Sequence, residues 1–354
     1  MKWMNDRRHE LCGRYKKGFL IFVICVFITI LSAFGTWLLT KDLYDQQAAD
    51  RWSDTADDYA QISCFYPIAM ELDDFGFLSL HHSVEEALTT ASIAAESENA
   101  DLFADAYSVT GKIQISSENA DKEVNVVGVS DSFFLFHPVQ LLAGSYFDEN
   151  MVMKDGVILD EDTAFQLYGS QDIVGKTVFI GGNPYYVRGV ASRDTSYFAK
   201  KAGLSEAVCF VPIETLLTHG TIVGSYTYEI VMPNPVEGFA KDTVVAALND
   251  TQQQIAVVEN STRFSFGAKK EVVLDFGVRS MSRNSILYPY WENIARATED
   301  ICGLFFILQS VTFVIAAVLF LWYVRILYKN RTWRTKDLLN KISDAMYERK
   351  CKRG

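Results

Sequence analysis

The sequence lacks the residue patterns that carry most enzymatic and metal chemistry. Its six cysteines include no Cys-x-x-Cys pair, and no Cys/His spacing suggests a metal site. It has no Gly-x-Ser-x-Gly turn and no convincing set of nucleophile and base. His81, His82 and His137 stand near no ligand pattern and are interpreted as exposed loop histidines. The sequence therefore predicts a protein that is not an enzyme and that holds no cofactor.

One stretch of the sequence matches the pattern of a phosphate-binding loop incompletely. Gly169 to Thr177 reads GSQDIVGKT, but the phosphate-loop pattern requires glycine at position 170, where the chain has Ser170. The apolar run 178–180 that follows predicts a strand, whereas phosphate binding needs a helix N-terminus at this point. Nucleotide binding is not expected, and Gly175 is interpreted as a turn glycine.

Two long hydrophobic runs contain no charged side chain. Phe19 to Leu39 and Ile301 to Val324 each have about 20 or more residues, enough for a helix to cross a bilayer. The alternative for the first run is a cleavable signal peptide with Ala33-Phe34-Gly35 as its cleavage site. The length of the run, which continues through Trp37, favours the membrane helix.

Charge is distributed unevenly along the chain. Residues 1–17 carry a net charge of +4 and residues 325–354 a net charge of +7, while the 17 basic and 39 acidic residues between them give −22. Basic flanks of membrane helices remain in the cytoplasm. We therefore expect both termini to be cytoplasmic and the acidic middle to lie outside. The acidic middle would repel phosphate, so nucleic acid is not an expected partner.

Cys64 and Cys209 are the cysteines that fall between the two hydrophobic runs, far apart in sequence. An oxidising compartment would allow a disulfide between them. Two buried free thiols are the alternative, and the sequence leaves both open.

Strand and helix patterns predict an α+β extracytoplasmic domain between the two membrane helices. Residues 157–159 predict a strand, Asp160 to Tyr168 a helix that ends at Gly169, and the segment around Gly181-Gly182 a hairpin. This small mixed α/β module, about 127–211, interrupts a strand–helix–strand subdomain. The flanking elements are expected as strands at 60–66, 103–115, 226–232, 255–258 and 271–276, and as helices at 83–97, capped by Ser83, and 236–254.

Two further segments bear on the membrane. Tyr288, Tyr290 and Trp291 precede the second hydrophobic run and suit an interfacial belt. In the tail, apolar residues recur at helical spacing among basic ones, which predicts an amphipathic helix that lies on lipid or contacts a partner. The apolar residues of this helix are Leu338, Leu339, Ile342 and Met346.

The order of short motifs from Val127 to Val190 carries a resemblance. The motifs are VGVS followed by FF, LLAGSYF, GVILDEDTAFQLYG and VGKTVFIGGNPYYVRGV. Together they resemble the periplasmic core domain of MacB-type ABC transporter permeases, the family that includes the lipoprotein-release and FtsX-like proteins. Family members usually have three membrane helices after this domain, whereas this chain has room for one, so it is interpreted as a short form with two membrane helices. The expected layout is a cytoplasmic segment 1–17, helices at 18–39 and 300–325, an outer domain at 40–299 and a cytoplasmic tail at 326–354.

The resemblance implies a non-catalytic subunit of an ABC complex, for export or mechanotransmission. The chain has no Walker A pattern, so any ATPase is expected to be a separate cytoplasmic chain. A second permease subunit or a homo-oligomer is expected beside it in the bilayer, and the tail residues Leu338, Leu339, Ile342 and Met346 are the candidate contact with the ATPase. The alternative is a bitopic membrane sensor or receptor whose outer domain binds a ligand.

Overall fold

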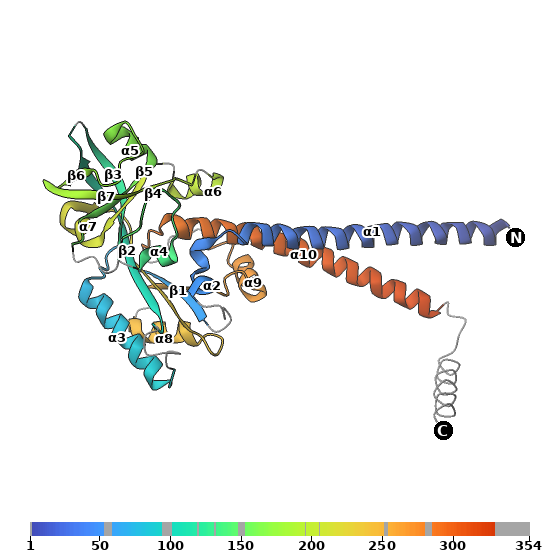
Figure 1. Ribbon diagram of the computed structural model, residues 1–354. Coiled ribbons are helices and arrows are strands. Elements are labelled where there is room, and N and C mark those ends of the chain that lie inside the picture. Colours follow the sequence, from blue (N-terminus) through green and yellow to red (C-terminus); the bar gives the residue numbers. More distant parts are fainter. Residues whose placement is uncertain are drawn as a thin grey trace, which may run out of the picture. The chain divides into compact units, whose positions relative to one another are not determined.

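The fold was obtained as a computed structural model that describes residues 2–52, 59–93, 101–118, 120–130, 132–147, 153–194, 196–204, 206–250, 254–279 and 285–329. The contacts within the chain divide it into two units. One unit comprises Met1–Trp37 and Leu304–Gly354, and the other is the globular domain Leu38–Gly303 (Figure 1).

Two long helices hold the apolar runs. They are α1 (Lys2–Thr40) and α10 (Tyr290–Lys329), and their stretches Lys16–Thr40 and Tyr290–Lys329 are long and apolar enough to cross a membrane. Within the first unit, the hydroxyls of Thr29 and Thr312 form a hydrogen bond of 2.7 Å. Small and polar residues of this kind are common where helices meet in a membrane.

The globular domain is built on an eleven-stranded sheet in the described residues. The strands are β1 (Tyr59–Phe65), β2 (Ala104–Ser116), β3 (Asp121–Val129), β4 (Leu141–Gly144), β5 (Gly156–Asp160), β6 (Thr177–Ile180), β7 (Asn183–Ala191), β8 (Val208–Pro212), β9 (Gly220–Ile222), β10 (Thr227–Pro233) and β11 (Ala256–Glu259). The main path of the sheet runs β11-β1-β10-β2-β3-β8-β5-β7-β4, and β6 and β9 pair with β2 beside this path.

One end of the sheet forms a split βαβ arrangement. Helix α3 (Asp74–Thr90) connects β1 to β2, and α8 (Phe239–Leu248) connects β10 to β11. The order β11-β1-β10-β2 with antiparallel neighbours is that of a βαββαβ subdomain. Figure 1 shows α3 and α8 together along this part of the sheet. The expected strand–helix–strand subdomain is therefore present.

The other end of the sheet is the expected α/β module, inserted between β2 and β10. It contains two parallel pairs, β3 with β8 and β5 with β7. Helix α5 (Glu161–Tyr168) begins where Asp160 accepts a hydrogen bond from the Asp162 amide and ends at Gly169, which has a left-handed φ of +68°. The β6–β7 hairpin turns at Gly181 and Gly182, both with positive φ. The helix and the hairpin that the local sequence signals predicted are therefore both present.

The remaining helices are α2 (Ala48–Trp52), α4 (Phe133–Phe136), α6 (Tyr197–Ala199), α7 (Ile213–His219) and α9 (Phe266–Leu274), with short turns η1 (Tyr44–Gln46) and η3 (Lys200–Leu204). Two expectations are wrong here. Helix α3 begins at Asp74, capped by Asp73 and not by Ser83. The expected strand at 271–276 is largely within α9, whose N-cap is Ser265.

The main core lies between α3, α8 and the sheet. Leu80, Val84 and Leu88 of α3 are buried against residues of β1 and β10 such as Ile62 and Ile230. A second cluster forms around α4, where Phe133, Phe134 and Phe210 pack together and Phe133 contacts Trp291 at the start of α10. The first turns of α10 therefore belong to the globular domain.

Candidate functional site: a buried polar network

The most unusual polar feature of the globular domain begins at His137, which follows α4. Its side chain is 1% exposed, with Nδ1 lying 3.0 Å from Asp45 Oδ1 and Nε2 bonded to Glu229. Burial alone would lower the histidine pKa, but the carboxylates of Glu229 and Asp45 outweigh it and raise the pKa to about 9. His137 is therefore protonated near neutral pH and donates from both ring nitrogens.

This position corrects the expectation that His137 is an exposed loop histidine. Both carboxylate partners lie 92 residues away in sequence, one on each side. The ring also lies 4.3 Å from that of Trp291, centroid to centroid. No local pattern around His137 indicates these contacts, since they depend on the folded sheet.

Glu229 extends the network across the sheet. It lies on β10, and its second carboxylate oxygen accepts a 2.6 Å hydrogen bond from the hydroxyl of Ser63 on β1. The Ser63 oxygen in turn accepts a 2.7 Å hydrogen bond from Nδ2 of Asn260, which follows β11. All three side chains are buried, and these bonds give their polar groups partners inside the domain, as buried polar groups require.

The network ends on α10 through Arg263, which is 4% exposed. Its guanidinium donates to Asn260 Oδ1 at 3.0 Å, to both carboxylate oxygens of Glu292 at 2.7 Å and to Glu299 at 2.5 Å. Arg279 adds contacts to Glu299 and Asp300. A buried arginine placed between two carboxylates avoids the large cost of an unpaired buried charge. The first turns of α10 are thus connected to the sheet by charge-assisted hydrogen bonds.

The segment that follows α1 joins the same strands. Gln61 of β1 is fully buried; its Nε2 donates to the Asp45 carbonyl at 2.7 Å, and its Oε1 accepts from the Ala48 amide at 2.9 Å. Together with the Asp45–His137 contact, these bonds hold the residues just after Thr40 to β1 and β10. Both chain segments that lead to apolar helices are therefore bonded to one pair of strands.

This arrangement resists separation of the first turns of α10 from the sheet. A buried donor or acceptor that loses its partner costs about 1–3 kcal/mol. Movement of α10 relative to the sheet would break several such bonds at once, so the bonded elements are expected to move together. Among the described residues, no group of three or more His, Cys, Asp or Glu side chains could hold a metal ion.

The aromatic residues before the second hydrophobic run also differ from expectation. Trp291 is 2% exposed and packs on His137 and Phe133. Tyr288 places its ring 5.1 Å from that of Phe65 on β1. Trp291 belongs to the buried core, so the interfacial belt was predicted wrongly for it, whereas Tyr288 is half-buried.

Cys64 and Cys209 are both free thiols in the structure. They lie on β1 and β8, which are separated in the sheet by β10, β2 and β3. Of the two readings left open by the sequence, the structure has the buried free thiols. Burial raises the pKa of Cys209 to about 11, and burial with the nearby Glu229 charge raises that of Cys64 further, which makes both thiols poor nucleophiles.

The phosphate-loop-like sequence does not begin a helix in the structure. Gly169 ends α5 and Thr177 begins β6, so the phosphate-loop-like sequence connects a helix to a strand. Gly175 has φ of +82°, as a turn glycine does. Leu338, Leu339, Ile342 and Met346 lie outside the residues that the structure describes.

A comparison with known protein families shows to which family the chain belongs. A family model described as the MacB-like periplasmic core domain matches residues 20–263. The chain belongs to the MacB-like periplasmic core domain family. The resemblance read from Val127 to Val190 is therefore confirmed, and the domain lies between two apolar helices in a chain related to ABC transporter permeases.

Named relatives share part of the chain. Macrolide export ATP-binding/permease protein MacB of Neisseria gonorrhoeae is 28% identical over 118 residues, which are 33% of this chain and 18% of that protein. The MacB of Photorhabdus laumondii is 22% identical over 149 residues, 41% of this chain and 23% of that protein. The match thus spans about a fifth of the length of these curated relatives.

Solved structures of the same kind are also similar. The periplasmic region of MacB from Actinobacillus actinomycetemcomitans is 18% identical with a TM-score of 0.38, covering 63% of this chain and 94% of that one. The extracellular domain of the noncanonic ABC-type transporter YknZ from Gram-positive bacteria is 18% identical with a TM-score of 0.36, covering 56% of this chain and 99% of that one.

Proposed function

We propose that this chain is a non-catalytic membrane subunit of a MacB/FtsX-type ABC transporter complex. In this proposal a separate cytoplasmic ATPase drives the membrane helices, and the helices move the outer domain for export or mechanotransmission. The observation that carries the proposal is the network from Glu229 to Arg263 and Glu292, which bonds the sheet to α10. Helix α10 continues without a break into an apolar stretch, so it can act as a lever.

The proposed layout follows the charge of the chain. Residues 1–17 and 326–354 are basic and would lie in the cytoplasm, while the acidic residues 40–299 would form the extracytoplasmic domain. The membrane helices would occupy 18–39 and 300–325. Membership in a periplasmic core domain family supports this orientation.

The proposed partners are an ABC ATPase and further membrane helices. The ATPase would contact the apolar stripe of the tail, Leu338, Leu339, Ile342 and Met346, because a stripe of this kind needs cover from lipid or protein. A second permease subunit or a second copy of this chain would complete the membrane part.

Purification of the full chain from its native membrane in mild detergent tests the proposal. Mass spectrometry of the eluate is expected to find an ABC ATPase in stoichiometric amount, together with a permease or extra copies of this chain. A signalling protein without an ATPase would overturn the proposal and support the bitopic sensor or receptor instead.

A further inference from the structure

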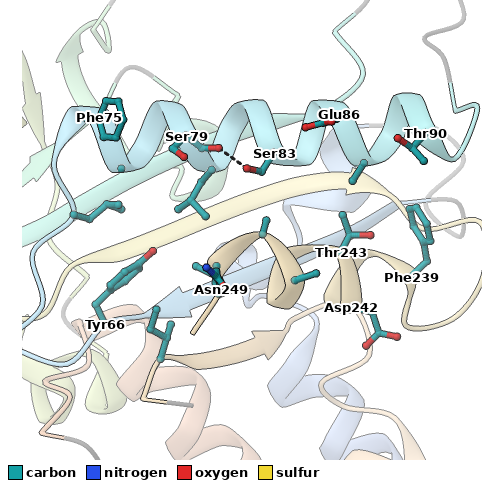
Figure 2. A pocket seen from close by; sticks show the side chains of 18 of the residues that line it. Tyr66, Phe75, Ser79, Ser83, Glu86, Thr90, Phe239, Asp242, Thr243 and Asn249 are labelled. Carbon is teal, nitrogen blue, oxygen red and sulfur yellow. Dashed lines mark hydrogen bonds between the residues drawn. The ribbon is translucent and has the colours of Figure 1, made fainter. Parts of the chain in front are cut away.

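A groove of about 1180 Å³ lies between α3 and α8 (Figure 2). It exceeds the roughly 300–1,000 Å³ of most small-molecule pockets. Its α3 wall extends from Gly76 to Ala91, fifteen helical steps that span about 22 Å at 1.5 Å per residue. The groove therefore has the length of a helix of about fifteen residues.

Small side chains form part of both walls, beside the larger Phe75 of α3 and Phe239 of α8. Gly76, Ser79, Ser83 and Ala87 follow one another at intervals of three and four residues on α3, so they share one face of the helix. Ala246 of α8 stands on the other wall, and the apolar floor includes Leu72, Leu80, Leu248 and Ile255. Figure 2 shows Ser79, Ser83 and Thr243 along the space between the two helices. Walls of this kind let another helix approach closely over an apolar floor.

A tyrosine lies at one end of the groove. Tyr66 lines the groove, and 5% of the residue is exposed. Figure 2 shows its side chain reaching toward the space between α3 and Asn249. Burial raises the pKa of Tyr66, so it remains a neutral phenol that can donate. The hydroxyl can therefore donate a hydrogen bond to a polar group of an occupant at this end of the groove.

The charged side chains on the groove walls indicate which charge an occupant should carry. The ionisable side chains on the two facing helix walls are Glu86 of α3 and Asp242 of α8, both exposed. The sequence from residue 52 to residue 111 contains twelve acidic residues and no lysine or arginine. An anionic occupant would be repelled here, whereas basic side chains could pair with both walls.

We propose that the groove is the docking site for a basic amphipathic helix of a partner protein. The apolar face of that helix packs on Leu72, Leu80 and Leu248, its lysine or arginine side chains reach Glu86 and Asp242, and a polar group accepts a hydrogen bond from the Tyr66 hydroxyl. This is helix-in-groove recognition, in which the anchoring residues of the bound helix recur at intervals of three and four positions. The proposal goes beyond the coupling function and holds whether or not an ATPase works with this chain.

A direct test measures binding of a fluorescent model peptide to the full chain in nanodiscs of neutral lipid, with the signal of empty discs subtracted. The probe is a sixteen-residue helix with leucine on one face and lysine on the other. Wild-type protein is expected to bind it saturably. Glu86→Gln with Asp242→Asn should weaken binding about tenfold, because two partly exposed ion pairs are lost. Tyr66→Phe, which removes only the hydroxyl, should weaken it severalfold.

The matched control is Glu85→Gln with Asp172→Asn, which removes the same charge from exposed residues that do not line the groove. Ser83→Trp fills the groove and should abolish binding, with retained folding checked by circular dichroism. A glutamine-for-lysine version of the probe should bind more weakly than the lysine probe. Equal binding to wild type and Ser83→Trp would overturn the proposal. So would an equal loss in the groove variant and the control variant, since that outcome means unspecific attraction to an acidic protein.

Discussion

Arg263 donates two hydrogen bonds, each 2.7 Å long, to the two carboxylate oxygens of Glu292. The pair is buried on both sides, and it joins the loop after β11 to the first turn of α10. A planar guanidinium is suited to such two-point contact, which a lysine cannot reproduce. This contact holds the first turn of α10 against the loop after β11.

Arg263→Leu should destabilise the fold strongly. It leaves the buried carboxylates of Glu292 and Glu299 without their main cation, and breaking a buried pair costs about 3–5 kcal/mol. Denaturant unfolding of the full chain in detergent, followed by tryptophan fluorescence, measures the change. Lys154→Leu is the control, since its pair with Glu214 is exposed and should contribute at most about 1 kcal/mol. Equal losses in the two variants would contradict the account.

The protonation of His137 should make stability depend on pH. Its pKa is about 9 in the fold and 6.5 for an ordinary histidine. Because the folded value is higher, the proton contributes its full stabilisation below pH 6.5, and this is lost as the pH rises through about 9. The free energy of unfolding should fall by roughly 3 kcal/mol across that window. His137→Gln should flatten this part of the pH profile; an identical slope in wild type and variant would show that other groups are responsible.

The left-handed glycine after α5 allows a separate test of backbone conformation. Gly169 has φ of +68°, and a Cβ added there meets no atom within 4 Å. Gly169→Ala should therefore lower the free energy of unfolding by about 1–2 kcal/mol through backbone strain alone. Gly277→Ala is the control, because that site is equally open and has no positive φ. A change of less than about 0.5 kcal/mol at Gly169 would argue against the left-handed cap.

The sequence predicted the inserted module well because its signals are local. Gly169 after an eight-residue helix and Gly181-Gly182 between short strands specify their structures with few distant contacts. Helix α3 was misplaced because Ser83 resembles a cap, whereas in the fold its hydroxyl donates to the Ser79 carbonyl inside the helix. The earlier start depends on Asp73, whose carboxylate accepts from the Gly76 amide.

The polar network could not be predicted in the same way. Its bonds join residues separated by 92 positions at His137 and by 166 and 197 positions at Ser63. Each residue considered alone suits a loop or an exposed strand face. Only the register of β1 with β10, which places Ser63 opposite Glu229, brings these polar groups together.

The tail provides a test of the partner. Leu339→Asp with Ile342→Asp places two charges on the predicted apolar stripe and should abolish co-purification of an ATPase while leaving the chain in the membrane. Asn340→Asp with Lys341→Gln lowers the charge equally on the other face of the predicted helix and should leave the ATPase bound. Retention of a stoichiometric ATPase by the stripe variant would rule out this stripe as the coupling site.

The central claim, that the network transmits ATP-driven movement to the outer domain, is tested most directly by hydrogen–deuterium exchange. The measurement compares β1 and β10 in the complex with its ATPase in nanodiscs, without nucleotide and after trapping with ATP and vanadate. The triple variant Arg263→Met, Glu292→Gln and Glu299→Gln removes the ion pairs around Arg263 without leaving that arginine's buried partners charged. We predict that trapping changes exchange in the wild-type strands and leaves the triple variant unchanged with its ATPase still bound. An equal change in both proteins would contradict the account.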